Sequence, residues 1–318
     1  MQDVYTHIET LGIVPVVVID GAQDAVPLAQ ALCRGGLPCA EVTFRTAAAE
    51  DAIRSITAHC PDMLVGAGTV LTAEQADRAI DAGARFIVSP GLNPATVRHC
   101  QQKGVPVFPG VSTASEIELA LSLGISTVKF FPAEQAGGIA AIKALSAPFA
   151  DMRFLPTGGI QPDNMNAYLA HPSVIACGGS WMVKKELIAA RQFDRIEKLT
   201  AEAVRTMLGF ELCRISIACT DKTEAKQAAG MFGALFGFAK PDGGAVFFGN
   251  SLELPPPPHL KKNGYIAVGV NSVMRAAAYL ERTGCACRTD TAAYKNGALA
   301  AICLAQEIAG FTVQLVQK

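Results

Sequence analysis

The sequence predicts an α/β protein in which a (β/α)8 TIM barrel is followed by a smaller C-terminal α+β domain. Between residue 13 and about residue 180, short apolar runs alternate with helical patterns, and the runs recur every ~20–25 residues. Eight such strand–helix repeats are typical of a closed barrel of parallel strands. A doubly wound open sheet is the main alternative, and the regular length of the eight units argues against it.

The expected strands are apolar throughout, as parallel strands covered on both faces are. They span residues 14–19, 39–43, 63–66, 86–89, 106–108, 127–130, 153–155 and 174–177.

The segments between these strands have helical periodicity and helix-end signals. Residues 24–34 place apolar side chains at intervals of three and four. The segment 72–82 begins with an N-capping threonine and stops at Gly83. The segment 113–123 also begins with threonine and carries Glu116 at the third helical position, which predicts a capping box.

After residue 208 the repeat length changes. Strands are expected at 213–219, 245–248, 251–254, 265–270, 299–304 and 311–316, and helices at 223–236 and 274–283. Four consecutive prolines, 255–258, can continue neither a helix nor a central strand. The pattern therefore predicts two copies of a strand–helix–strand–strand unit in the tail, joined at the proline run. We expect domains at 1–208 and 209–318.

The composition excludes several classes of protein. The chain has 318 residues, of which 50% are hydrophobic and 17% charged, so it can bury a large core and is not disordered. Its 27 basic and 28 acidic residues favour neither nucleic acid nor a membrane surface as a partner. No signal peptide or transmembrane run is visible. The ten scattered cysteines, without a CxxC pair, indicate free thiols and a cytoplasmic protein rather than disulfides or a zinc site.

Reactive residues of a barrel lie where its strands end, on the C-terminal face. Unusual residues follow most of the expected strands here. They are Glu41 and Arg45 at the second, Thr69 at the third, Pro90 at the fourth, Lys129 and Phe131 at the sixth, Thr157, Gly158 and Gly159 at the seventh, and Gly178, Gly179 and Ser180 at the eighth.

Lys129 and Glu41 are the candidate catalytic residues. Lys129 is flanked by phenylalanines in an apolar run. Desolvation there disfavours the ammonium, and a neutral amine can form a Schiff base with a carbonyl. Glu41 can shuttle protons between water and an imine. The alternatives are a lysine that reaches solvent from the strand end, and a structural carboxylate paired with Arg45 or Lys129.

The other strand-end residues suit an anionic substrate. The Arg45 guanidinium can bind a carboxylate through two hydrogen bonds, although an ordinary surface arginine would look the same. The glycines around Thr69 let the backbone approach a ligand closely. The glycine pairs after the seventh and eighth strands match the usual phosphate site of such barrels, and each pair alone could be a simple turn.

The five histidines, His7, His59, His99, His171 and His259, all lie outside the strand ends. None has a cysteine or carboxylate at the spacing of a metal site. This argues against a mechanism that depends on histidine or on a metal, and we expect no cofactor.

The strand ends resemble those of the 2-keto-3-deoxy-6-phosphogluconate (KDPG) and 4-hydroxy-2-oxoglutarate (KHG) aldolases. The most specific matches are Lys-Phe-Phe-Pro-Ala-Glu at 129–134 and Pro-Thr-Gly-Gly-Ile at 156–160. The other matches lie in order at 41–46, 65–71, 89–92, 109–113 and 178–181.

The resemblance implies a metal-free class I aldolase that cleaves KDPG to pyruvate and glyceraldehyde 3-phosphate, and that also acts on KHG. It gives Lys129 the Schiff-base role and Glu41 the proton-transfer role. It places Arg45, Thr69 and Thr157 at the pyruvyl part, Pro90 and Phe131 in the pocket, and Gly158, Gly159, Gly179 and Ser180 at the phosphate. It also implies a homotrimer. The galactonate-specific relatives lack the arginine, so Arg45 favours the gluconate substrate.

The tail resembles the glyoxalase-type (vicinal oxygen chelate) modules. In those modules a histidine on the first strand and a glutamate on the last bind a metal. Here these places hold Tyr265 and Gln314, Glu307 falls outside the last strand, and residues 213–219 offer no histidine. We therefore expect no metal chemistry in the tail.

Other functions stay open at this point. The protein could be a non-catalytic barrel with the tail as a ligand-sensing module, but that would need damage at the reactive positions, and none is visible. An isomerase or epimerase on a phosphate-binding barrel would not need the lysine. The closely related activity is 2-keto-3-deoxy-6-phosphogalactonate cleavage.

Overall fold

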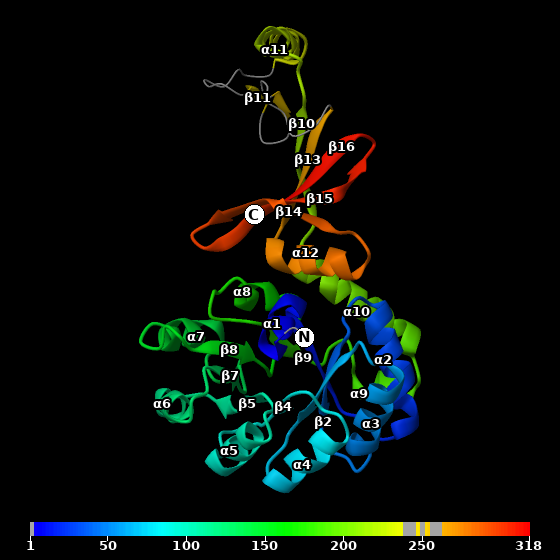
Figure 1. Cartoon of the computed structure of the whole chain (residues 1–318), viewed down its shortest axis with the longest axis vertical. Coiled ribbons are helices and arrows are strands. Elements are labelled where there is room, and N and C mark those ends of the chain that lie inside the picture. Colours follow the sequence, from blue (N-terminus) through cyan, green and yellow to red (C-terminus); the bar gives the residue numbers. More distant parts are fainter. Residues whose placement is uncertain (1–2, 238–245, 249–251, 255–262) are drawn as a thin grey trace. The chain divides into compact units, whose positions relative to one another are not determined.

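The computed structural model describes residues 3–237, 246–248, 252–254 and 263–318. The chain forms two compact units, Met1–Met207 and Leu208–Lys318. Each unit has its own sheet system, and they are described separately below (Figure 1). Among the described residues, no helix combines the length and apolar character needed to cross a bilayer.

The first unit is a barrel of parallel strands. One sheet has the order β5-β4-β3-β2-β1-β9 and a second has the order β6-β7-β8. Parallel bridges join Phe154 to Val174 and Thr157 to Gly178. They connect the β8 region to β9 and the residues just before it, and so close the barrel. The strands are β1 Ile13–Val17, β2 Cys39–Thr43, β3 Leu64–Gly68, β4 Ile87–Val88, β5 Val107–Phe108, β6 Gly110–Val111, β7 Thr127–Phe130, β8 Arg153–Pro156 and β9 Cys177–Gly179. The predicted (β/α)8 barrel is confirmed.

Two strands differ from their expected form. The fifth is divided by Pro109, so that β5 pairs with β4 and β6 pairs with β7. The eighth was expected at 174–177, but β9 begins at Cys177 and includes Gly178 and Gly179. A Cβ on Gly178 would lie 2.3 Å from the Thr157 hydroxyl oxygen, and one on Gly179 would lie 1.8 Å from the Trp181 ring. Glycine, which usually weakens a strand, is therefore required in this one because side chains press against its backbone.

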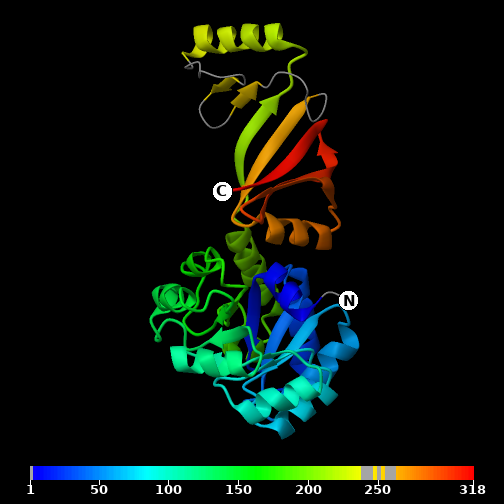
Figure 2. The ribbon, with the colours of Figure 1, turned by 60° about the vertical axis from the view of Figure 1, so that its left-hand side comes forward.

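The helices surround the strands (Figures 1 and 2). The Thr72 hydroxyl caps α4, and Thr113 with Glu116 forms the predicted capping box of α6. The helical elements are α1 Val4–Leu11, the 3₁₀ turn η1 Ala22–Asp24, α2 Ala25–Arg34, α3 Ala49–His59, α4 Ala73–Asp81, α5 Pro94–Gln102, α6 Ala114–Ser122, α7 Gly138–Ser146, α8 Met165–Leu169, α9 Lys185–Ala189 and α10 Phe193–Leu208.

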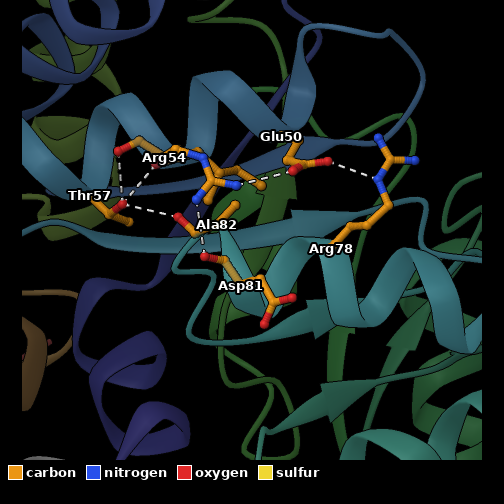
Figure 3. Close-up of polar contacts among 7 residues, drawn as sticks. Glu50, Arg54, Thr57, Arg78, Asp81 and Ala82 are labelled. Carbon is orange, nitrogen blue, oxygen red and sulfur yellow. Dashed lines mark hydrogen bonds and ion pairs between the residues drawn. The ribbon is translucent and has the colours of Figure 1, made fainter.

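Polar contacts connect α3 to α4 and to the turn that follows it (Figure 3). Glu50 accepts from Arg78 at 2.8 Å and from Arg54 at 3.1 Å. The hydrogen bond from Arg78 is the main cause that lowers the pKa of Glu50. The Thr57 hydroxyl donates to the Ala82 carbonyl oxygen at 3.2 Å. These exposed ion pairs connect neighbouring outer helices of the barrel, and each contributes little to stability.

The described part of the second unit has a seven-stranded sheet of order β11-β12-β10-β13-β16-β15-β14 and two helices. Its elements are β10 Glu211–Ile217, α11 Lys222–Phe236, β11 Val246–Phe248, β12 Leu252–Leu254, β13 Gly264–Val270, α12 Val273–Arg282, β14 Cys287–Lys295, β15 Ala298–Ile308 and β16 Phe311–Gln317. The predicted elements are present, but β14 was missed, so the second copy is strand–helix–three strands. The proline run lies outside the described residues.

A polar row crosses this second sheet. Ser216 on β10 is in register with Glu253 on β12 and with Tyr265 on β13, and Tyr265 is in register with Thr312 on β16. The Glu253 carboxylate accepts the Tyr265 hydroxyl and lies 3.4 Å from Arg214. Burial and the bond to Glu253 raise the pKa of Tyr265 to about 12, so its hydroxyl stays a donor at neutral pH. The buried Glu253 carboxylate thus already has hydrogen-bond and ion-pair partners within its own unit.

Candidate active site

The candidate catalytic residues meet inside the barrel. Glu41 lies on β2 and Lys129 on β7, and Lys129 is in register with Gly110 of β6 and Leu155 of β8. The Lys129 Nζ is 3.2 Å from the Glu41 Oε1. The two residues are only 5% and 1% exposed. A lysine that extends from the strand end into solvent is therefore excluded, and Glu41 is paired with Lys129 rather than with Arg45.

Space for the carboxylate comes from a glycine on the neighbouring strand. A Cβ on Gly68 of β3 would lie 2.1 Å from the Glu41 Oε1. The other carboxylate oxygen, Oε2, is buried and has no hydrogen-bond partner among the described residues. An uncommitted buried oxygen is costly for stability unless something else bonds to it. Glu41 therefore has one oxygen for the amine and one that a substrate or water can use.

An aromatic ring also lies close to the Lys129 amine. The Nζ of this amine lies 5.3 Å from the centre of the Phe131 ring. Attack on a carbonyl requires a neutral amine, and the Glu41 carboxylate 3.2 Å away is placed to exchange protons with it. The pair can therefore supply both a nucleophile and a proton carrier.

Arg45 and Thr69 form a second contact at the barrel mouth. Arg45 is exposed on the loop after β2, and its Nε donates to the Thr69 Oγ1 at 3.3 Å. Thr69 follows β3 with φ of 56°, a left-handed conformation that is uncommon for threonine. Such strain is typical of functional loops, where it aims a side chain.

A cavity of about 190 Å³ opens beside this group. It unites seven of the nine predicted substrate-binding residues, namely Arg45, Phe131, Thr157, Gly158, Gly159, Gly179 and Ser180. The Thr157 hydroxyl is buried and has no partner among the described residues, so it is free to bond to a ligand. Gly158 and Gly159 have φ of 100° and 81°, which side-chain-bearing residues rarely adopt.

Four predicted residues do not line this cavity: Lys129, Glu41, Thr69 and Pro90. Phe131 links the two groups, because it lines the cavity and also contacts Lys129. Pro90 lies after β4, where its carbonyl oxygen would be 2.0 Å from a Cβ on Gly110. It therefore packs against the strand next to β7.

The cavity also has wall residues that were not predicted: Val16, Val18, Ile160 and Gln161. Val16 and Val18 belong to the apolar first-strand region, whose sequence does not show which side chains face the mouth. Ile160 and Gln161 directly follow the glycine pair in the sequence. Their position next to this motif could have predicted that they line the cavity.

None of the described histidines lines the cavity. His99 on α5, for example, has its Nε2 2.9 Å from the Asp77 Oδ1, on the outer helices. His259 lies outside the described residues.

Comparison with known proteins identifies the barrel. The family model for KDPG and KHG aldolases matches residues 4–199, which is more than half of the chain. The chain belongs to this aldolase family. A 2-dehydro-3-deoxy-phosphogluconate aldolase of Treponema pallidum is 52% identical over 205 residues, which are 64% of this chain and 98% of that protein.

Solved structures of KDPG aldolases match the same part of the chain. The enzyme of Legionella pneumophila, with pyruvate captured as a covalent carbinolamine intermediate, is 40% identical. It covers 64% of this chain and 98% of its own, with a TM-score of 0.62. The enzyme of Zymomonas mobilis with 3-phosphoglycerate is 41% identical and covers 63% and 94%, with a TM-score of 0.59.

The aldolase family match ends at residue 199, so it does not include the second unit. The glyoxalase-type resemblance of that unit stays a prediction.

Proposed function

We propose that the protein is a class I aldolase that cleaves KDPG to pyruvate and glyceraldehyde 3-phosphate, and that it also cleaves KHG to pyruvate and glyoxylate. The observation that carries this proposal is the buried Lys129–Glu41 pair, which lies next to the Phe131 wall of the cavity. The family membership and the relatives with pyruvate and 3-phosphoglycerate support the same chemistry.

The reaction begins with the amine. The neutral Lys129 attacks the C2 ketone of the substrate and forms a carbinolamine. Glu41 gives a proton to the departing hydroxyl, water leaves, and an iminium remains. The positive nitrogen then serves as the electron sink for the next step.

Carbon–carbon cleavage follows. Glu41, now a carboxylate, removes the proton of the C4 hydroxyl. The electrons of the C3–C4 bond move to the iminium nitrogen, and glyceraldehyde 3-phosphate leaves as the aldehyde. The enamine takes a proton at C3, and hydrolysis releases pyruvate and regenerates the Lys129 amine.

The remaining residues bind the two ends of the substrate. Arg45, Thr69 and Thr157 bind the pyruvyl carboxylate and keto group, with Arg45 already oriented by its bond to Thr69. Phe131 and Pro90 exclude water from the reacting carbons. Gly158, Gly159, Gly179 and Ser180 bind the phosphate through backbone N–H groups and the serine hydroxyl. A cytoplasmic homotrimer is part of this proposal, on the basis of the family resemblance.

The test is pyruvate release, measured with a lactate dehydrogenase-coupled assay on KDPG, its galactonate epimer and KHG. We expect efficient cleavage of KDPG and slower cleavage of KHG. Preference for the galactonate epimer would change the substrate but keep the mechanism. Absence of pyruvate from all three would overturn the proposal in favour of a sensing barrel.

A further inference from the structure

The glycine pair at the cavity is supported from outside the cavity by a buried tyrosine. Tyr168 on α8 is 1% exposed, and its hydroxyl donates to the Glu134 Oε1. Burial, and then the Glu134 carboxylate, raise the pKa of Tyr168. The tyrosine therefore remains a hydrogen-bond donor at neutral pH. Neither residue lines the cavity.

Glu134 transmits this contact to the glycine pair. Its backbone N–H donates to the Gly158 carbonyl oxygen at 3.1 Å. Its side chain lies directly against the next residue, because a Cβ on Gly159 would be 2.5 Å from the Glu134 Cγ. Any movement of Glu134 must therefore change the space available to Gly159.

The same loop is held from a second direction. The Asn164 Nδ2 donates to the Gly159 carbonyl oxygen at 3.1 Å, and the Asn164 Oδ1 accepts from the Gln161 N–H at 2.9 Å. Glu134 on one side and Asn164 on the other therefore restrain the backbone of residues 158–161. All four of these residues line the cavity.

The charge of Glu134 makes its orientation important. The carboxylate belongs to an exposed residue, yet its stem touches the loop assigned to the substrate phosphate. A carboxylate free to rotate toward a phosphate would repel it. The hydrogen bond from Tyr168 holds the carboxylate in one direction, toward the buried hydroxyl.

We propose that Tyr168 is a positioning residue for the phosphorylated end of the substrate, and that it acts by fixing the Glu134 carboxylate against the Gly158–Gly159 loop. The inference rests on the proposed function, since it takes this loop as the phosphate site. It predicts that Tyr168 affects binding of the phosphorylated substrate and leaves chemistry on free pyruvate unchanged.

The experiment compares Tyr168→Phe with the wild-type protein in two reactions. One is KDPG cleavage, for which kcat and KM are measured separately. The other is exchange of the pyruvate methyl protons with deuterated solvent, which needs Lys129 and Glu41 but no phosphate. We expect KM for KDPG to rise about tenfold, as loss of a hydrogen bond to a charged group implies. We expect kcat and the pyruvate exchange rate to stay within about twofold.

Glu134→Gln removes the negative charge of Glu134 but keeps its hydrogen bond with Tyr168. Its amide oxygen still accepts the Tyr168 hydroxyl, and the negative charge is gone, so KM for KDPG should not rise. In the double variant Tyr168→Phe, Glu134→Gln, the rise in KM should be smaller than in Tyr168→Phe alone. Tyr279→Phe on α12 of the second unit is the matched control for replacing a tyrosine with phenylalanine. It should leave both KDPG cleavage and pyruvate proton exchange unchanged.

Two results would overturn the inference: an equal fall in KDPG cleavage and in pyruvate exchange for Tyr168→Phe, or an unchanged KM for KDPG. A double variant as impaired as Tyr168→Phe would remove the role of the Glu134 charge. The proposed function fails in a different way, because the wild-type protein itself would then neither cleave KDPG nor exchange the pyruvate protons.

Discussion

Each of the two units of the chain contains a buried glutamate with a basic neighbour, and the two glutamates differ in what else they bind. Glu41 in the barrel is 1% exposed and pairs with Lys129 through Oε1, while its Oε2 has no partner among the described residues. Glu253 in the second unit is 8% exposed. Its Oε2 accepts from Tyr265 and lies beside Arg214.

This difference in partners is what the proposed function requires of a proton-transferring acid and of a structural acid. Arginine stays protonated, and Tyr265 holds its proton because its pKa is raised to about 12. Neither of these two groups therefore exchanges a proton readily with Glu253 at neutral pH. Glu41 faces the Lys129 amine, and its second oxygen, Oε2, has no partner among the described residues. In the proposed mechanism the same side chain therefore takes part in catalysis in the barrel, whereas in the second unit it bonds to structural neighbours.

Replacing the lysine should have the largest effect. Lys129→Arg keeps a positive charge beside Glu41 but supplies a guanidinium that stays protonated and cannot attack a carbonyl. We expect KDPG cleavage to fall to the uncatalysed background in the coupled assay. Cleavage clearly above that background would mean that Lys129 is not the nucleophile.

Glu41→Gln should come next. The amide keeps the shape of the side chain and loses the proton carrier, so kcat should fall by roughly 10²–10⁴ while pyruvate still binds. The exchange of pyruvate methyl protons, followed by NMR, should slow to a similar extent. An unchanged exchange rate would show that another group shuttles the proton.

The identical substitution in the second unit should affect stability instead. Glu253→Gln replaces a charged acceptor of Tyr265 and Arg214 with a neutral one, and we expect the free energy of unfolding of that unit to fall by about 1–3 kcal/mol. The kcat for KDPG should not change. A loss of kcat without a loss of stability would contradict the assignment of Glu253 as a structural acid.

Removing the second unit should have the smallest effect on the chemistry. All the proposed reactive residues lie between Glu41 and Ser180, within the first compact unit. A chain of residues 1–210 should therefore cleave KDPG within about tenfold of the full-length rate, or ~1.4 kcal/mol in the barrier. A folded, soluble shortened protein without activity would show that the second unit completes the active site.

The barrel could be predicted from the sequence because its signals are local and repeated. Helix caps such as Thr72 and Thr113, and apolar runs at regular intervals, each report on their own segment. The eighth strand was placed too early because Gly178 and Gly179 look like a loop. Only the tertiary contacts with Thr157 and Trp181 show why glycine is needed there.

The sequence could predict which residues belong to the candidate site, but not how they are arranged in space. The sequence left open whether Glu41 pairs with Lys129 or Arg45, because residues 88 positions apart meet only through closure of the barrel. The Tyr168–Glu134 contact was missed for the same reason. In the second unit, β14 was missed because it is an edge strand with charged residues such as Arg288 and Asp290 and no buried apolar face.

In the proposed mechanism, Lys129 forms the Schiff base. The most direct test of this step is borohydride reduction of the full-length protein in the presence of pyruvate, followed by intact mass and peptide mapping. The account predicts one reduced pyruvyl group per chain, located on Lys129 and absent from Lys129→Arg. Labelling of Lys143 or Lys184 instead, or no labelling of a protein that cleaves KDPG, would contradict it.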